Sequence, residues 1–306
     1  MSDLHIRKIP WQFDETTPFQ WNPTNPEFGL IGNVVSFVAP AFERYIVAVV
    51  PQAQERITDP ADAEEADLFL RQEALHARAH RNHTAALVAQ YPGLQEPLDA
   101  ADAMYDDLLE REPLEYHLAY VADVEATFTP FFRMMLDNEA SLFAGGDDRV
   151  ASLLMWHFVE EIEHRSSALI VYRAVIDGDR YRVRKMPSVF NHVRGVADVI
   201  FDAFERHVPK EVRLVDPPRR STLKRLPAEL LAGRKGERAH PSAYADVPKG
   251  QLLRMGYGLV RSQLPGHQPR DQRLPAFADA WLDAYDREVD VTRWYESSAT
   301  TAGANA

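Results

Sequence analysis

The feature that most constrains the fold is a set of carboxylates and histidines inside long, otherwise apolar helical stretches. The clearest case is HFVEEIEH, residues 157–164, which carries two histidines and three glutamates within about two helical turns. Charged side chains are rarely buried unless they are paired or bind a metal ion. The stretch therefore predicts a polar site inside a bundle of helices.

Helical geometry divides this stretch into two faces. At about 100° per residue, His157, Glu161 and His164 fall within about 60° of one another. Glu163 points well away from them, and the direction of Glu160 lies between these two faces. We therefore expect the inward face of this helix to present two histidines and one glutamate.

Three other long stretches carry matching residues. Glu73 and His76 are three positions apart and share a face of the helix expected over about 58–91. Glu43 and Glu125 stand among apolar and aromatic neighbours, in VAPAFERYIVAVV and LAYVADVEATFTPFF. In chain order the four helices carry Glu, Glu-x-x-His, Glu and Glu-x-x-His, the ligand pattern of carboxylate-bridged dinuclear sites in four-helix bundles.

The residue types suit a pair of divalent metal ions. Four carboxylates balance the charge of two such ions, and imidazoles complete an oxygen and nitrogen ligand set suited to iron or manganese. Each part alone has a simpler explanation: a solvated Glu-x-x-His, an ion pair of Glu43 with an arginine, an exposed Glu125. The order of all four on four helices favours the metal site.

The rest of the chain predicts an all-α fold, a ferritin-like four-helix bundle with additional helices. Helices are expected over about 33–56, 58–91, 97–110, 114–143, 147–176, 187–207, 252–263 and 276–287. The proline-rich, basic text over 208–251 indicates a solvated irregular excursion, or alternatively a basic patch for an anionic partner. We expect a bundle over 1–207, a C-terminal extension packed on it over 208–296, and a disordered tail over 297–306.

Composition excludes several classes of protein. The chain has no cysteine, which excludes disulfides and thiolate metal sites. No signal-peptide pattern is visible, so a cytoplasmic location is expected. The net charge of −12 argues against general nucleic-acid binding. Residues 29–50 are long and apolar enough to span a membrane, but Pro40, Glu43 and Arg44 interrupt them, so a buried helix is expected instead.

These motifs resemble those of known metalloproteins. The ligand pattern resembles the ferritin-like di-iron carboxylate superfamily, and His157, one turn before Glu161 and His164, is similar to the third histidine of p-aminobenzoate N-oxygenase-type enzymes. The phrases RQEALHARAH, HLAYVADVEATFT and HFVEEIEHRSSA resemble a bacterial family described as predicted metal-dependent hydrolases, over most of the chain. The resemblance implies two iron ions, or a manganese and iron pair, bound by Glu43, Glu73, His76, Glu125, His157, Glu161 and His164.

Further residues near the ligand helices are candidates for supporting roles. His80, Glu160, Arg44 and Arg165 could orient the ligands from outside, or be ordinary polar and surface residues. Six aromatic residues lie within about a turn of the ligands and could line an apolar pocket, with core packing as the alternative: Phe42, Tyr120, Phe128, Phe131, Trp156 and Phe158.

The leading functional expectation is an O2-activating oxygenase or oxidase acting on a small, largely apolar substrate. The local sequence and the long C-terminal extension depart from the N-oxygenase pattern, which leaves substrate and reaction open. No dinucleotide-binding G-x-G-x-x-G motif is present, so electrons would come from a separate donor protein. The alternatives are metal-dependent hydrolysis at a dinuclear site and a non-catalytic metal-binding or storage bundle. A homodimer is a further expectation.

Overall fold

The structure, a computed structural model, describes residues 4–217 and 242–294. Every regular element in those two ranges is a helix, which confirms the predicted all-α class. The α-helices are α1 (Pro26–Gln54), α2 (Pro60–Gln90), α3 (Gln95–Arg111), α4 (Leu114–Leu136), α5 (Glu139–Leu142), α6 (Asp148–Glu163), α7 (Ser167–Val175), α8 (Arg180–His207), α9 (Lys210–Arg213), α11 (Lys249–Ser262) and α12 (Ala276–Asp286). Short 3-10 helices cover Pro92–Leu94, Pro269–Asp271 and Val291–Arg293.

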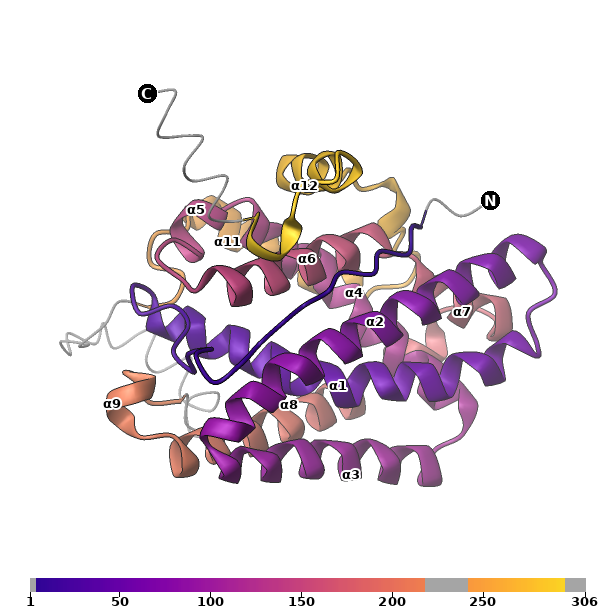
Figure 1. Ribbon diagram of the computed structural model, residues 1–306. Coiled ribbons are helices and arrows are strands. Elements are labelled where there is room, and N and C mark those ends of the chain that lie inside the picture. Colours follow the sequence, from indigo (N-terminus) through magenta and orange to yellow (C-terminus); the bar gives the residue numbers. More distant parts are fainter. Residues whose placement is uncertain (1–3, 218–241, 295–306) are drawn as a thin grey trace.

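Two long helix pairs form a bundle (Figure 1). Helix α1 packs along α2, and α4 packs against α6 and α7. The two pairs meet where α1 contacts α4 and where α2 contacts α6 and α7. Helices α3 and α8 lie along the outside, against α1 and α4 respectively, so the bundle interior is enclosed by helices on several sides.

Side chains at the helix starts explain where three of these helices begin. Asn25, Asp59 and Asp147 each accept a hydrogen bond from a backbone N–H group of the first helical turn. Pro26 and Pro60 occupy the first helical position, where a missing N–H group costs nothing. Because Asn25 caps α1, that helix begins seven residues before the predicted start at 33.

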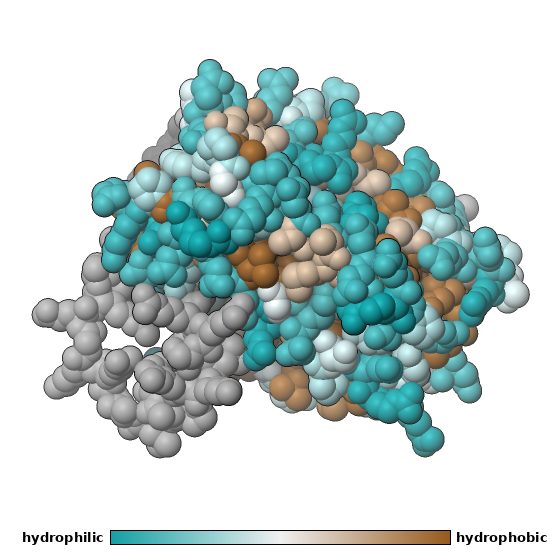
Figure 2. Space-filling model, turned by 90° about the horizontal axis from the view of Figure 1, so that it is seen from below, coloured by the Kyte–Doolittle hydropathy of each residue, from teal (hydrophilic) through white to brown (hydrophobic). Residues whose placement is uncertain are grey.

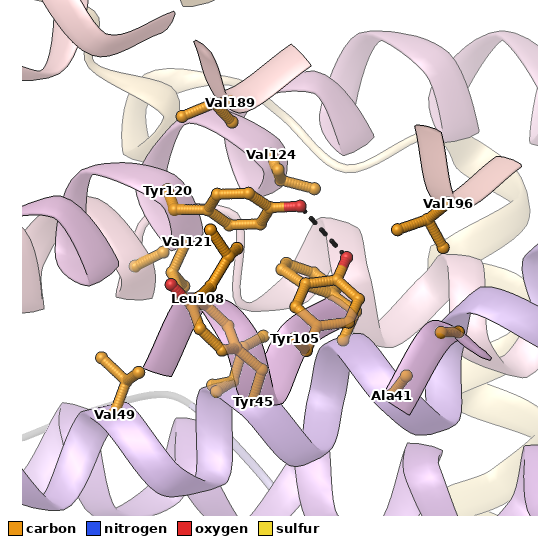
Figure 3. Packing of buried hydrophobic residues seen from close by; sticks show 14 of the residues in the cluster. Ala41, Tyr45, Val49, Tyr105, Leu108, Tyr120, Val121, Val124, Val189 and Val196 are labelled. Atoms are coloured by element: carbon orange, nitrogen blue, oxygen red, sulfur yellow. Dashed lines mark hydrogen bonds between the residues drawn. The ribbon is translucent and has the colours of Figure 1, made fainter. Parts of the chain in front are cut away.

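Aromatic and branched side chains from four helices fill the core beside α3 and α8. Figure 3 shows Tyr45 and Val49 of α1 facing Tyr105 of α3 and Tyr120 of α4. The hydroxyl groups of Tyr120 and Tyr105 are hydrogen-bonded at 3.1 Å, and both rings are buried. Neither of these two buried hydroxyl groups is therefore left without a hydrogen bond.

Two predicted helices are interrupted in the structure. The helix expected over 114–143 ends at Leu136, where the Asn138 side chain donates to the carbonyl of Met134 and replaces a helical hydrogen bond. The helix expected over 147–176 ends at Glu163 and resumes at Ser167. Arg165 donates to the carbonyls of Ile162 and Glu163, which satisfies the exposed end of α6.

Other helix boundaries depart less from the prediction. Helix α8 begins at Arg180 instead of 187 and continues through Pro187, which was expected to mark its start. Residues 218–241, the centre of the predicted excursion, and 297–306, the predicted tail, lie outside the described residues. The proposed division of the chain at residue 207 stays a prediction.

Helix α1 contains residues 29–50, the apolar segment that the sequence predicts to be a buried helix and not a membrane span. It is long and apolar enough to cross a bilayer by length and composition. In the structure it packs against α2, α3, α4 and α8, and 61% of its most apolar window is buried. Its hydrophobicity is therefore accounted for by its place inside the bundle. The face seen from below in Figure 2 is mostly hydrophilic, with apolar residues in small groups.

The N-terminal segment runs as an extended chain beside α2 and α6 (Figure 1). The Gln72 amide of α2 donates to the carbonyl of His5 at 3.0 Å, and the ring of Trp11 lies 5.5 Å from that of Trp156 on α6. This segment covers the junction of two ligand-bearing helices and brings its own side chains to it.

Candidate metal centre

The seven predicted ligands meet in the interior of the bundle. Helix α1 supplies Glu43, α2 supplies Glu73 and His76, α4 supplies Glu125, and the end of α6 supplies His157, Glu161 and His164. Each of these residues is at most 3% exposed. They form two groups with one shared member, and the potential ligand atoms of each group lie within 4.8 Å of one another.

The first group consists of Glu43, His76, His157 and Glu161. The Nε2 atom of His157 lies 2.8 Å from Oε1 of Glu161 and 3.4 Å from Oε1 of Glu43. The Nδ1 atom of His76 lies 3.3 Å from the same Glu161 oxygen. Three helices therefore direct two imidazole nitrogens and two carboxylates at one point.

The second group consists of Glu73, Glu125, Glu161 and His164. The Nε2 atom of His164 lies 2.9 Å from Oε2 of Glu161, 3.3 Å from Glu73 and 3.5 Å from Glu125. Glu161 thus presents Oε1 to the first group and Oε2 to the second. This is the geometry of a carboxylate that bridges two metal ions.

The break after α6 places the last candidate ligand, His164. His164 is the residue that follows the helix, with φ −87° and ψ 15°, so it leaves the helical path that the sequence predicted for it. Its backbone N–H still bonds to the carbonyl of Glu160, which keeps the side chain near the expected direction. The His164 side chain therefore still lies beside Glu161, as the i, i+3 spacing predicts, although the helix ends at Glu163.

Each histidine has its other ring nitrogen against an acceptor. His76 Nε2 lies 2.9 Å from Glu160 Oε2, His157 Nδ1 lies 2.9 Å from His80 Nε2, and His164 Nδ1 lies 3.0 Å from Gln72 Oε1. A ring nitrogen that donates to such an acceptor leaves the opposite nitrogen without a proton and free to bind metal. The His80 ring is fixed in turn by Ser36 Oγ, 3.0 Å from its Nδ1 atom.

Arg7 supplies the charge that balances the outer carboxylates. Its guanidinium donates to Glu160 at 3.0 Å and to Glu163 at 2.7 and 2.8 Å, and Arg7 is only 4% exposed. The hydrogen bonds to Glu163 and the electrostatic attraction of both carboxylates raise the pKa of Arg7 despite its burial. The N-terminal segment is therefore joined to the ligand His76 through Glu160.

Burial controls the protonation of the carboxylates in the metal-free site. It raises the pKa of Glu125 to about 8 and the pKa values of Glu43 and Glu73 well above the usual range. Burial acts in the same sense on Glu161, but His164, His157 and His76 together lower its pKa well below the usual value. The bridging position is thus the one carboxylate of the set held ionised by its neighbours.

Unpaired polar atoms show what the site lacks without a cation. Buried atoms that accept or donate no hydrogen bond include Glu43 Oε2, both oxygens of Glu73, Glu125 Oε1 and His76 Nδ1. Buried polar groups without partners are costly and uncommon. These atoms belong to the two groups, and metal ions bound there would satisfy them. The donor set therefore fits two divalent cations.

The other predicted residues fall into two sets. Glu160 and His80 contact ligand histidines, as described above, while His80 lies outside both groups. Arg44 instead pairs with Asp102 and Asp106 of α3 at the surface. Arg165 caps α6 and donates to the carbonyls of Pro269 and Arg270, which ties the end of α6 to the C-terminal part of the chain.

The six aromatic residues mostly pack against one another. Phe42 contacts Tyr105, Tyr120 and Phe128, and Phe158 stacks on Phe132 at 4.1 Å. Phe131 is partly buried against Phe132. Trp156 lies 4.9 Å from the His76 ring and lines a cavity of about 320 Å³ together with Arg7 and Trp11. Trp156 therefore lies between this cavity and the candidate ligand His76.

Sequence reasoning missed Arg7, Gln72 and Ser36. Gln72 is four residues before His76, so the same helical-face argument could have included it. Arg7 lies in the N-terminal lead-in, more than 150 positions from its partners, and no local pattern marks it. Its role depends on the path of the extended segment across the bundle.

The chain matches the model of a known protein family. A family model described as "Predicted metal-dependent hydrolase" matches residues 5–235. No curated protein and no solved structure matches the chain. The matched region contains all seven ligand candidates together with Arg7, Gln72, His80 and Glu160.

Proposed function

Because the chain belongs to the family of predicted metal-dependent hydrolases, we propose that its seven clustered side chains hold two divalent metal ions and form an enzyme's reaction centre. The observation that carries this proposal is the shared residue Glu161, whose two oxygens face different ligand groups. Such a pair of ions supplies Lewis acidity for hydrolysis or, where the metal is iron or manganese, redox chemistry with O2.

The chain's own residues would hold and orient this centre. The hydrogen bonds to Glu160, His80 and Gln72 fix which nitrogen of each histidine faces the metals. Burial by the surrounding helices excludes bulk water from the ligand atoms.

Hydrolysis is the first candidate reaction, because it is the reaction that the family description names. That description is of a predicted activity and specifies no substrate. Two metal ions would lower the pKa of a water molecule and polarise the bond to be cleaved. This candidate requires that some coordination positions stay open for water and substrate.

Oxidation by O2 is the second candidate, and the donor set favours it. The four carboxylates and the imidazoles of His76 and His164 match the ligands of ferritin-like di-iron proteins, which the sequence pattern also resembles, and His157 adds a third imidazole. Seven protein ligands leave fewer open positions than a hydrolytic pair normally keeps. In this case electrons would come from a separate donor and the substrate would be small and largely apolar.

One set of measurements separates these candidates. Protein loaded anaerobically with ferrous iron is exposed to O2 while oxygen uptake and visible absorption are recorded. The same chain loaded with zinc or manganese is assayed on ester, amide and phosphate-ester substrates. Rapid oxygen uptake with a transient visible band favours oxidation, metal-dependent cleavage favours hydrolysis, and two tightly bound ions with neither activity indicate storage or a structural site.

Replacing His157 by alanine tests the ligand that distinguishes the first group. We expect the variant to lose occupancy of one metal ion, and the optical spectrum of the iron or cobalt form to change, because one imidazole is removed. His80→Ala is the matched control, since His80 contacts His157 but lies in neither group, and it should keep both ions with about 10-fold weaker binding. Unchanged metal content and spectrum in His157→Ala would place His157 outside the ligand set.

A further inference from the structure

An exposed apolar ridge is formed by Leu253, Tyr257 and Val260 on the outer face of α11 and by Leu264, two residues after the helix ends. These side chains are 75%, 67%, 65% and 52% exposed. They account for four of the five large apolar side chains that are exposed in the described ranges. Leu253, Tyr257 and Val260, at intervals of four and three residues, lie within about 60° of one another on α11. Large apolar side chains gathered in this way commonly mark a contact surface.

The opposite side of α11 is anchored, which fixes the direction of the ridge. Leu252 and Met255 pack against the core cluster around α6, and Gln263 donates to the carbonyl of Asp123 on α4. A Cβ atom at Gly258 would lie 2.7 Å from Pro130 of α4, so a glycine is needed for this close approach. The ridge therefore projects from a helix that is already packed on its other face.

Positive charge flanks the ridge. Lys249, Arg254 and Arg261 are on α11, which contains no acidic residue. Arg254 and Arg261 lie on the same side of the ridge and, with Arg133 of α4, line a cavity of about 350 Å³. Asp137 also lines this cavity, and its Oδ2 atom lies 3.7 Å from Nε of Arg133. Its negative charge therefore balances that of Arg133, and the charges of Arg254 and Arg261 remain.

The charge around α11 is opposite to that of the whole chain. Lys249, Arg254 and Arg261 give α11 three positive charges and no acidic residue, whereas the complete chain has a net charge of −12. Apolar walls from Pro130 and Met255 complete the cavity beside the arginines. A partner suited to this surface must therefore combine negative charge with an apolar layer directly beneath it.

We propose that α11 docks on an anionic phospholipid surface. The ridge enters the boundary between head groups and acyl chains, with Tyr257 at that boundary, and Arg254 and Arg261 bind phosphate groups beside it. A nucleic acid fits the arginines but offers no apolar layer for Leu253 and Val260. Figure 1 places α11 on the side of the molecule away from α3, so docking leaves the hydrophilic face of Figure 2 in water. The proposal is independent of which reaction the metal centre performs.

Vesicle binding by the full-length protein tests this proposal. Vesicles of phosphatidylcholine alone are compared with vesicles that also contain phosphatidylglycerol, and bound protein is measured by sedimentation at several salt concentrations. We expect binding only to the anionic vesicles, with affinity that falls as salt rises. The double variants Leu253→Ser with Tyr257→Ser, and Arg254→Glu with Arg261→Glu, should each weaken binding by about 10-fold or more.

Two control variants keep the comparison specific. Val289→Ser removes an exposed apolar side chain elsewhere, and Arg194→Glu reverses an exposed charge on α8. Both should bind vesicles as the parent protein does, and circular dichroism should show equal helix content in all variants. No binding to anionic vesicles at low salt, or equal loss in Arg194→Glu, overturns the proposal. Self-association without lipid that the ridge variant abolishes also overturns it, because the ridge would then contact a second copy of the chain.

Discussion

Glu161→Gln is expected to reduce the bound metal from two ions per chain to one or none. Glutamine has nearly the same shape, so the packing of α6 is retained, but it has one neutral oxygen where the carboxylate has two charged ones. Both ligand groups lose this member at once. Metal affinity should fall by more than about 100-fold, beyond the 10–100-fold typical of residues that only contact a ligand.

Elemental analysis after equilibrium dialysis measures this loss directly. Glu163→Gln is the control, because Glu163 lies on the same helix and contacts Arg7 but belongs to neither group. It should retain two ions per chain. The bridging assignment would be wrong if Glu161→Gln also retained two ions with unchanged magnetic or optical coupling between them. Hydrolytic and oxidative candidates predict the same result here, so this variant tests the centre and not the reaction.

The clustering of the seven candidate ligands could be predicted because the information for it is local. An i, i+3 or i, i+4 spacing places Glu73 with His76, and His157 with Glu161, wherever the helices lie in space. An isolated carboxylate such as Glu43 is conspicuous because its neighbours are apolar. Charge balance for two divalent ions then limits how many carboxylates the site requires. The structure brings all seven candidates into two groups.

Contacts that depend on the path of the chain could not be predicted in the same way. Arg44 follows the ligand Glu43 in sequence, yet it points to Asp102 on α3, because adjacent helical residues face different directions. Arg165 follows His164 but caps the helix instead of contacting a ligand. Arg7, which does reach Glu160, lies on an extended segment whose route across α2 and α6 has no periodic signal.

Helix continuity was the least predictable feature. The helix predicted over 147–176 includes residues 164–166, yet the chain leaves the helix there. The interruption depends on Arg165, whose side chain replaces two backbone hydrogen bonds and then contacts residues 269 and 270. Whether the helix continues or the Arg165 side chain bonds its last carbonyls thus depends on residues far away in the sequence, and helical periodicity does not reveal it.

Removing the metal is expected to make stability depend on pH between about 6.5 and 8. In the metal-free fold, burial raises the pKa of Glu125 to about 8 and those of Glu43 and Glu73 well above 4.5. The unfolded chain loses these protons near pH 4.5, so the folded state binds more protons over this range. The free energy of unfolding must therefore fall as pH rises, by about 1.5 kcal/mol across this window for a carboxyl with a pKa near 8.

The lower limit of the window follows from two buried histidines, His80 and His83, whereas despite burial neighbouring carboxylates raise the pKa values of His76 and His164, which therefore act in the same sense as Glu125. Burial lowers the pKa of His83 to about 4 and that of His80 well below 6.5, so below pH 6.5 the unfolded chain binds protons that the fold does not. These groups make stability rise with pH up to about 6.5, which opposes the carboxylates there. Burial raises the pKa of Asp123 to about 7, although Arg182 lowers it. Asp123 therefore also makes the free energy of unfolding fall as pH rises, and it does so with or without metal.

Bound metal should remove most of the decline, since ligand carboxylates must lose their protons to bind it. Urea unfolding followed by circular dichroism at pH 6.5, 7.25 and 8, with chelator and with saturating metal, measures the difference. The stabilisation by metal should grow with pH, and metal titration should release protons. Glu125→Gln provides the matched control, because it removes one titrating carboxyl and should make the metal-free decline shallower. A free energy of unfolding that stays constant or rises over this range without metal would show that the carboxylates are already ionised in the metal-free fold.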